Sequence, residues 1–211
     1  MTFVISCVAF FAYYKASAQT NWEKHPGNPI IVGGSSGTWD QFGVLAMGVL
    51  FDSSTYHMWY TGIGIGGVRL GYATSPDKTT WTKHPSNPVL DTGPVGSWDQ
   101  GGPGSPSVVK DGSTYRMWYD ARDSSGNTRI GYATSPDRVT WTKYGGNPVL
   151  GTGAPGEWDD EGVFTAMVIL QGSTYQMWYG GWDSTNTRIG YATSSDGISW
   201  TKFAGNPVLD R

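Results

Sequence analysis

Three acidic residues stand side by side in the last third of the chain, at Asp159, Asp160 and Glu161. Neighbouring carboxylates repel one another, so partial burial would raise the pKa of at least one of them. A carboxylic acid that keeps its proton near neutral pH can serve as a general acid. Glu161 and Asp160 are therefore candidate catalytic acids, and a solvated acidic loop is the alternative interpretation.

Asp40 and Asp99 occupy positions equivalent to Asp159, and all three follow a tryptophan. Asp99 and Asp40 are candidates for a catalytic base, or for a group that adjusts the pKa of the acid. Their repetition favours a structural role, in which the aspartate caps a turn and the tryptophan covers the edge of a sheet. The tryptophans themselves are candidate substrate-binding residues: Trp39, Trp98 and Trp158.

Asp120 and Arg122 differ from the residues at equivalent positions elsewhere in the chain. Together at the end of an expected strand they could bind hydroxyl groups of a substrate, and a surface ion pair is the alternative. His57 lies within an expected strand at a position predicted to face solvent. No grouping of His, Asp or Glu has metal-ligand spacing, so no cofactor is predicted, although a structural metal ion in a central channel is compatible with the sequence.

The elements that must position these side chains form a repeat. Tryptophans recur at intervals of 59, 60 and 59 residues, each followed at a fixed distance by Asn-Pro. Trp-Asp, Tyr-x-Met-Trp-Tyr and Gly-Tyr-Ala-Thr-Ser recur three times in the same register. The recurring tryptophans are Trp22, Trp81, Trp141 and Trp200.

Each repeat contains four strand-like runs, as the second one illustrates. A first strand at 107–110 ends at Asp111-Gly112, a hairpin signal, and an aromatic strand follows at 114–120. A third strand is expected at 129–134, and a fourth opens at 141–143. Tandem four-stranded antiparallel meanders of this length predict an all-β fold, the β-propeller. The expected blades are 39–90, 98–150 and 158–210, preceded by an extra outer strand at 22–31.

Three blades are fewer than a closed propeller uses, because rings close with about four to eight. The sequence therefore predicts either a part of a longer, five-bladed protein or two chains that complete one ring. An isolated copy would expose strand edges and apolar faces at both ends. The expected state is a monomeric fragment or, as the alternative, a homodimer.

Composition narrows the class of partner and the compartment. The net charge is only −3 and no basic cluster is present, which excludes a nucleic-acid partner. The apolar run from Phe3 to Tyr14 is too short to span a membrane, and Ala16-Ser17-Ala18 suits signal peptidase. We expect a signal peptide at 1–18 and a mature segment at 19–211, secreted or displayed on the surface of a bacterial cell. The single cysteine, Cys7, lies within the signal, so disulfides are excluded from the mature chain.

Ser-x-Asp-x-x-x-Trp, preceded by Gly-Tyr-Ala-Thr-Ser, resembles the turn of the five-bladed β-propeller glycosidases of glycoside hydrolase families 43 and 32. Those families include arabinanases, xylosidases, levansucrases and invertase-like enzymes. The resemblance implies a carbohydrate partner and three carboxylates in the central funnel, two of which must flank the glycosidic bond. The matching positions are Ala46, Ser105 and Thr165, and none is acidic.

Two functions are compatible with these observations. The first is a secreted glycoside-hydrolase-like propeller that acts on or binds polysaccharide or oligosaccharide. The second is a non-catalytic propeller that binds carbohydrate or serves in surface display, favoured by the missing carboxylates. The sequence leaves open whether the protein is an enzyme.

Overall fold

The computed structural model describes residues 23–210, and this part of the chain forms twelve β-strands and no helix. The predicted signal peptide at 1–18 and Trp22 lie outside the described residues. The described part holds no helix that is long and apolar enough to cross a membrane.

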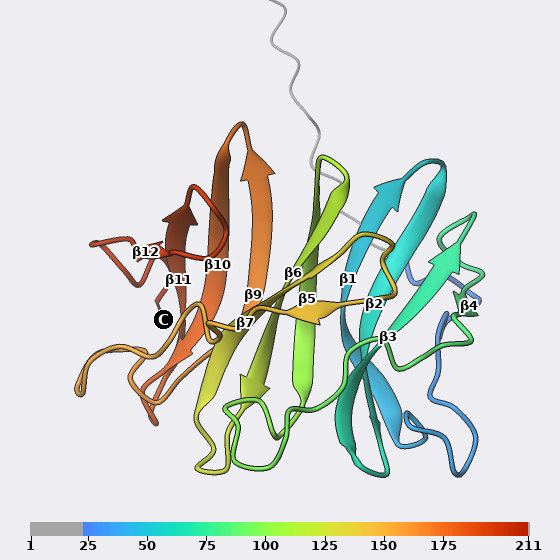
Figure 1. Ribbon diagram of the computed structural model, residues 1–211, viewed down its shortest axis with the longest axis horizontal. Coiled ribbons are helices and arrows are strands. Elements are labelled where there is room, and N and C mark those ends of the chain that lie inside the picture. The colour runs from blue at the N-terminus through green and yellow to red at the C-terminus, as the bar shows by residue number, and fades with distance from the viewer. Residues whose placement is uncertain (1–22, 211) are drawn as a thin grey trace, which may run out of the picture.

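The strands form three successive four-stranded antiparallel meanders, which stand side by side in Figure 1. The first consists of β1 (Gly43–Asp52), β2 (Thr55–Gly64), β3 (Gly67–Ser75) and β4 (Thr82–Lys83). The second consists of β5 (Pro103–Asp111), β6 (Thr114–Arg122), β7 (Thr128–Ser135) and β8 (Thr142–Lys143). The third consists of β9 (Gly162–Gln171), β10 (Thr174–Trp182), β11 (Thr187–Ser194) and β12 (Thr201–Lys202).

The meanders meet through their first strands, because β5 packs against both β1 and β9. One parallel bridge, Thr128 to Gly162, links the second meander to the third by backbone pairing. Elsewhere the meanders adhere through side chains rather than through a shared hydrogen-bond ladder. This arrangement is the all-β propeller architecture that the repeat predicts.

The second strands of the first two meanders are buried on both faces over their central residues, whereas β10 in the third meander is partly exposed. In β6, Met117, Trp118 and Tyr119 are all fully buried. This explains why the repeated Tyr-x-Met-Trp-Tyr run is continuously apolar rather than alternating, as a strand covered on two sides requires.

The Ser-x-Asp-x-x-x-Trp turn lies between the third and fourth strands of each meander. The Oδ1 atom of Asp77 accepts hydrogen bonds from the backbone N–H groups of Thr79 and Thr80 at 2.8 and 2.7 Å, so the aspartate closes the turn. In the second meander, the turn carbonyl of Arg138 accepts two indole N–H groups. Trp141 donates one within the turn, and Trp59 of the first meander donates the other at 3.0 Å.

The same contact recurs between the second and third meanders, where Trp118 donates to the carbonyl of Gly197 at 2.8 Å. Trp118 also meets Trp200 edge to face, with ring centroids 6.0 Å apart. At the equivalent position of the third meander, Trp178 is 36% exposed. The predicted structural role of the motif, in closing a turn and packing between meanders, therefore agrees with its contacts.

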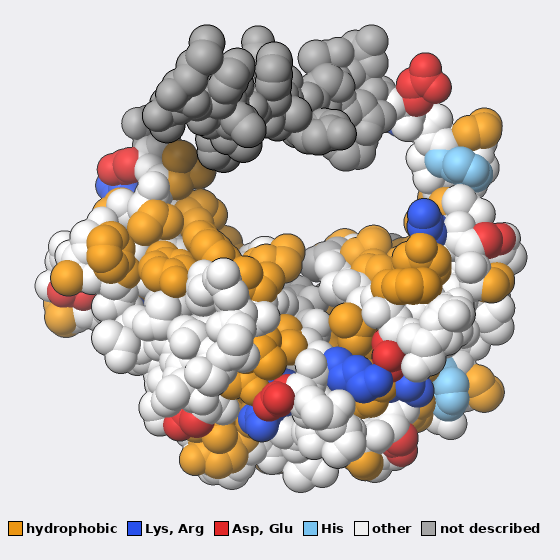
Figure 2. All heavy atoms as spheres, turned by 90° about the horizontal axis from the view of Figure 1, so that it is seen from above, with side chains coloured by type: hydrophobic (Ala, Val, Ile, Leu, Met, Phe, Trp, Pro, Cys, Tyr) orange, Lys and Arg blue, Asp and Glu red, His pale blue; other side chains and the backbone are white. Residues whose placement is uncertain are grey.

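Apolar side chains of β1 and β9 are exposed, and Figure 2 shows hydrophobic side chains gathered over both ends of the row. They include Met47, Val49, Phe51, Met167 and Ile169. The number of blades in the complete ring and the oligomeric state stay predictions.

Residues 23–31 form turns and no strand, unlike the extra outer strand expected at 22–31. A fourth strand in this fold pairs with the third strand of its own meander, and the described residues hold no such partner upstream of β1. Ile31 nevertheless packs against the apolar cluster of Met58, Tyr60 and Ala73 in the first meander.

Candidate functional site

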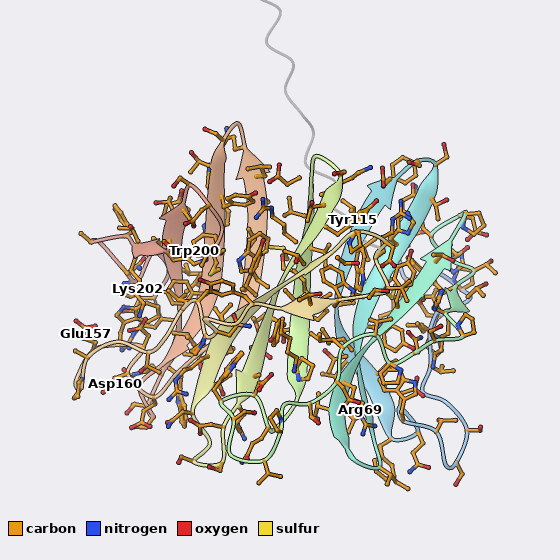
Figure 3. All side chains as sticks on the ribbon, in the orientation of Figure 1. Arg69, Tyr115, Glu157, Asp160, Trp200 and Lys202 are labelled. Carbon is orange, nitrogen blue, oxygen red and sulfur yellow. The ribbon has the colours of Figure 1, made fainter. Side chains whose placement is uncertain are left out.

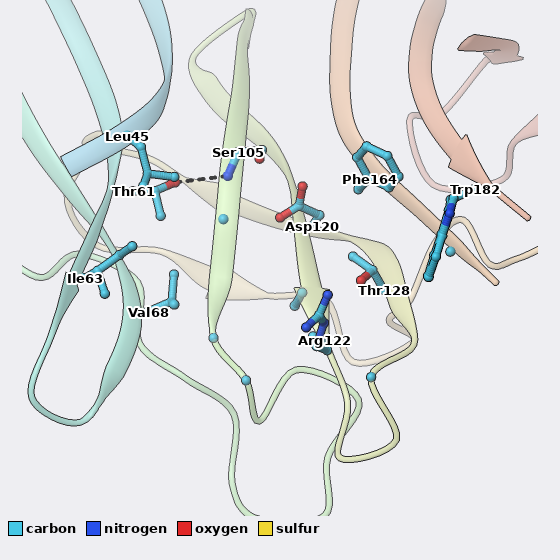
Figure 4. A pocket seen from close by; sticks show the side chains of 16 residues that line it. Leu45, Thr61, Ile63, Val68, Ser105, Asp120, Arg122, Thr128, Phe164 and Trp182 are labelled. Carbon is cyan, nitrogen blue, oxygen red and sulfur yellow. Dashed lines mark hydrogen bonds between the residues drawn. The ribbon is translucent and has the colours of Figure 1, made fainter. Parts of the chain in front are cut away.

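A cavity of about 490 Å³ opens where the three meanders meet (Figure 4). All three contribute to its wall: Leu45, Thr61 and Ile63 from the first, Asp120 and Arg122 from the second, and Phe164 and Trp182 from the third. Most of the lining is apolar, and the few polar groups come mainly from β5 and β6. A concave apolar wall with a few converging polar groups is the usual form of a small-molecule site.

Several positions on the wall differ between the three repeats. Position 120 is Asp, whereas its equivalents are Thr61 and Gly180, and position 122 is Arg, whereas its equivalents are Ile63 and Trp182. Positions that make the repeated contacts within each meander are instead identical in all three repeats, such as the Trp-Asp pairs and the last tyrosine of Tyr-x-Met-Trp-Tyr. The cavity thus coincides with the asymmetric part of the repeat.

Asp120 holds the central position on this wall, between Ser105 and Phe164 in Figure 4. Its Oδ2 atom accepts a hydrogen bond from the backbone N–H of Thr165 at 2.8 Å. Burial raises the pKa of Asp120 above its ordinary value, although the Thr165 N–H, the Ser105 hydroxyl and the nearby Arg122 charge act in the opposite direction. Asp120 therefore keeps its proton to higher pH than a solvated aspartate does, which is the property that a general acid needs.

Two residues that contact Asp120 have unusual backbone conformations. Ser105 and Thr165 have φ angles of 44° and 48°, in the left-handed region that non-glycine residues rarely enter. Both lie at irregularities in strand pairing, where β5 and β9 each carry an extra residue. The bulge in β9 points the N–H of Thr165 at Asp120, and the N–H of Ser105 donates to the Thr61 hydroxyl at 3.1 Å. Strained backbone of this kind is concentrated at functional sites.

Ser105 and Thr165 are also the positions at which the resemblance implies catalytic carboxylates. Ser105 lines the cavity, Thr165 lines a neighbouring one, and neither residue is acidic. The carboxylate at this place comes from Asp120, one strand further along the second meander.

Arg122 lies on the same strand as Asp120 and lines the same cavity (Figure 4). The surface ion pair considered from the sequence is not formed between them within 4 Å among the described residues, although the charge of Arg122 lowers the pKa of Asp120. Both residues thus face the cavity, as a substrate-binding role requires.

Asp40, Asp99 and Asp159 lie in loops and do not line the cavity. Each is nearly fully buried and forms an ion pair with a lysine of the fourth strand in its own meander. The Asp99–Lys143 and Asp159–Lys202 pairs measure 2.6 and 2.7 Å. These ion pairs tie each loop to the fourth strand of its meander, and Oδ1 of Asp40 also accepts the backbone N–H of Gly34 at 3.2 Å. The catalytic role considered for Asp40 and Asp99 stays a prediction without a contact to the cavity.

The three Trp-Asp tryptophans lie against the last tyrosine of each second strand. Trp98 meets Tyr119 with ring centroids 5.8 Å apart, and Trp39 and Trp158 make the equivalent contacts. All three are half-buried and absent from the cavity wall. Their candidate role in binding substrate stays untested, and the aromatic side chains at the cavity are instead Phe164 and Trp182.

Asp160 accepts a hydrogen bond from the backbone N–H of Gly156 at 2.6 Å. Gln41 and Gln100 make the same contact in the other repeats, so the change to Asp160 preserves a structural bond. Figure 3 shows Asp160 and Glu157 in the loop at the outer side of the third meander, near Lys202. Glu161 is exposed and directly precedes Gly162, which lines the cavity.

His57 is buried, in contrast to its predicted solvent-facing position. Its Nδ1 atom forms a hydrogen bond with the Tyr72 hydroxyl at 2.5 Å, and its ring stacks on the same tyrosine. Burial lowers the pKa of His57, so the imidazole is held neutral. The polar residues at the equivalent positions, Arg116 and Gln176, suggest exposure, but His57 lies in a buried run of β2.

The described residues contain no group of three or more His, Cys, Asp or Glu side chains that could hold a metal ion. The carboxylates of the Trp-Asp loops are occupied by lysines, and the cavity wall carries the single carboxylate of Asp120.

No family model matches the chain. Two uncharacterized proteins of Mycobacterium tuberculosis, MT1551 and Rv1502, are each 28% identical to it over 203 residues. The match covers 88% of this chain and 63% of each relative, so the chain spans less than two thirds of their length.

Solved structures share the architecture. Zg3597, a family 117 glycoside hydrolase from Zobellia galactanivorans, superimposes with a TM-score of 0.69 at 18% identity, over 84% of this chain and 60% of its own. A family 130 glycoside hydrolase that targets β-1,2 mannosidic linkages gives 0.65 at 21% identity, over 89% and 59%. Fructan 1-exohydrolase IIa from Cichorium intybus gives 0.62 at 19% identity, over 84% and 34%.

The fold is that of the β-propeller glycosidases. The sequence-based recognition of this fold is confirmed. At these identities the similarity concerns the architecture alone, so the chemistry must be argued from the cavity.

Proposed function

We propose that the cavity binds a carbohydrate and that the protein is a glycoside-hydrolase-like propeller in which Asp120 is the general acid. One observation carries the proposal: Asp120 is a carboxylic acid with a raised pKa, fixed by the Thr165 N–H on the wall of the central cavity. Phe164 and Trp182 line the same cavity, where their rings can stack on the apolar face of a sugar.

In this proposal, protonated Asp120 donates its proton to the oxygen of the bond that is broken. A second carboxylate is needed on the other side of the sugar, as nucleophile or as the base that activates water. Glu161 is our candidate, because it is exposed and directly precedes Gly162, which lines the cavity. Support for a glycosidase also comes from the fold, which the solved neighbours use in carbohydrate chemistry.

A non-catalytic carbohydrate-binding protein is the second candidate. It is favoured by the cavity wall, on which Asp120 is the one carboxylate contributed by the described residues. Binding needs stacking surfaces and hydrogen bonds but no second carboxylate. The two candidates differ in turnover, not in the place where the sugar lies.

The deciding experiment measures hydrolysis and binding on the same protein. The purified chain is assayed on aryl glycosides and on arabinan, xylan and fructan, and sugar binding is measured by calorimetry. Turnover that is abolished by Asp120→Asn and by Glu161→Gln, with binding retained, supports the enzyme. Binding without turnover supports the second candidate. Glu23→Gln, an exposed change outside the cavity, is the control, and absence of any sugar binding would remove both candidates.

We also propose that the protein is secreted by a bacterium, supported by the apolar run and the Ala16-Ser17-Ala18 site of the N-terminal segment. Expression with this segment should yield extracytoplasmic protein that starts at Gln19, as read by N-terminal sequencing. Retention of the segment in a cytoplasmic product would contradict the proposal.

A further inference from the structure

Arg122 differs from every other arginine in the described part of the chain. Each of the others lies within ion-pair distance of an aspartate: Arg69, Arg116, Arg129, Arg138 and Arg188. Arg122 has no carboxylate within that distance and makes no side-chain hydrogen bond among the described residues. The chain carries a net charge of −3, so an unpaired cation inside a cavity is not explained by an excess of positive charge.

The neighbourhood of Arg122 keeps its charge available. Asp120 is the nearest acidic group on the wall, and its raised pKa favours the neutral form. The remaining walls are largely apolar, with Val68 and Ile63 on one side and Trp182 on the other. Arg122 itself is exposed, so an anion that enters the cavity can reach its guanidinium, and no carboxylate of the described residues lies within ion-pair distance to compete.

We infer that the cavity selects a sugar that carries a carboxylate, as a hexuronic acid does, and that Arg122 binds this group. This inference rests on the proposed carbohydrate function and names its substrate class. A guanidinium can donate two parallel hydrogen bonds to a carboxylate, which fixes the orientation of the ring as well as its charge. Phe164 and Trp182 then cover the apolar face of the same sugar ring. Asp120 lies two residues before Arg122 on β6.

The repeat supports a specific role for this arginine. The equivalent residues, Ile63 and Trp182, also line the cavity, so the position faces inward in all three meanders. A cation is present at one of them only. Because the other described arginines pair with an aspartate of the chain, as Arg129 does with Asp123 at 3.1 Å, the placement of Arg122 indicates an external anion.

The test compares an oligosaccharide of hexuronic acid with its methyl ester, which has the same shape and no charge. Calorimetry on the full chain should show at least a tenfold tighter binding of the acid, and the preference should shrink as salt is added. Arg122→Gln should abolish the preference while binding of the ester is retained, and Arg122→Lys should keep part of it. Lys24→Gln, which removes an exposed positive charge elsewhere, is the matched control and should keep the full preference.

Equal binding of acid and ester by the native chain would overturn this inference and leave the proposed carbohydrate function intact. A preference that persists in Arg122→Gln would also overturn it. If neither sugar binds, the proposed function fails together with it. Inorganic phosphate is added as a competitor of the uronic acid. Displacement of the uronic acid by phosphate at equal concentration would contradict selection of a carboxylate and indicate a phosphate site instead.

Discussion

The backbone N–H of Thr165 donates to the carboxylate of Asp120 across the seam between the third and second meanders, at 2.8 Å. Thr165 adopts a φ of 48° at a β-bulge to make this bond, and this conformation is energetically unfavourable for a β-branched residue. The bond favours the charged form of Asp120, whereas burial disfavours it more strongly. The site therefore combines backbone strain with an acid that folding makes harder to ionise.

This arrangement predicts a gain in stability when the acid is removed. Because the folded pKa of Asp120 is raised above its unfolded value, Asp120 stabilises the fold most at low pH, and that contribution is lost as pH rises through the folded pKa. Asp120→Asn cannot ionise and can still accept the Thr165 N–H. We expect the variant to melt at a higher temperature than the native chain at pH 7, with a smaller difference at pH 3.

Melting temperatures of the native chain and of Asp120→Asn, measured from pH 7 to pH 3, test this prediction. Glu23→Gln, at an exposed site, should follow the native curve. A native-like melting temperature for Asp120→Asn at every pH would show that burial does not raise the pKa of Asp120 as described.

The repeats offer a matched pair of tryptophans for a second prediction. Trp118 donates to the Gly197 carbonyl and is fully buried, whereas the equivalent Trp178 is partly exposed and makes no such bond among the described residues. Trp118→Phe should lower the free energy of unfolding by about 2 kcal/mol, from a lost hydrogen bond and a residual cavity. Trp178→Phe should cost less than about 0.5 kcal/mol.

Urea denaturation of both variants checks this difference. Similar losses for the two substitutions would mean that Trp178 is also covered by a neighbouring surface in solution. Self-association of the exposed end faces is one source of such cover, and light scattering on the same samples would detect it.

The strands were predictable because each repeat provides an independent copy of the same signal. The second strand of the second meander was expected at 114–120 and occupies Thr114–Arg122. The irregular first strands were harder to predict. Ser105 and Thr165 have positive φ angles at β-bulges, and neither residue type is typical of such a conformation. Glycine, the usual marker of such a conformation, is absent from both positions.

The candidate site was only partly predictable, for a reason of the same kind. Asp120 and Arg122 attract attention because they depart from the repeat, and that departure is the signal that locates the cavity. Contacts between meanders leave no such trace. Asp52 illustrates this, because its partners Lys110 and Arg138 lie 58 and 86 residues away in the sequence. They come close to Asp52 only when the meanders pack.

A third prediction concerns a buried oxygen with no hydrogen-bond partner, Oδ1 of Asp159. In the other repeats the equivalent oxygens accept a hydroxyl group, as from Ser97 to Asp99 at 2.7 Å. The third repeat has Glu157 at that position, which supplies no donor when ionised. Glu157→Ser should restore the bond and stabilise the chain by about 1 kcal/mol.

Chemical denaturation of Glu157→Ser and of its mirror, Ser97→Ala, checks the argument from both directions. Ser97→Ala should destabilise the chain by about 1 kcal/mol or more, since it leaves the buried Asp99 oxygen without this donor. An unchanged or lower stability of Glu157→Ser would show that the Asp159 oxygen is satisfied by water.

The last prediction follows from the ion cluster around Asp52 at the seam between the first two meanders. Lys110 donates to both carboxylate oxygens at 2.9 Å, the Tyr115 hydroxyl donates at 2.8 Å, and Arg138 is 3.2 Å away. These donors hold the pKa of Asp52 well below its usual range, with Lys110 the largest cause. A depressed folded pKa contributes stability that is present above the unfolded value of about 3.9 and is lost as pH falls toward the folded pKa.

Asp52→Asn should therefore be less stable than the native chain at pH 7, and the difference should narrow as pH falls below about 4. Urea midpoints measured from pH 7 to pH 2.5 give this comparison, with Glu23→Gln as the control for a lost surface carboxylate. The equivalent position in the third repeat is Gln171, so an amide is compatible with the backbone there and Asp52→Asn should fold. A constant stability difference across the whole range would assign the loss to packing at the seam rather than to the charge of Asp52.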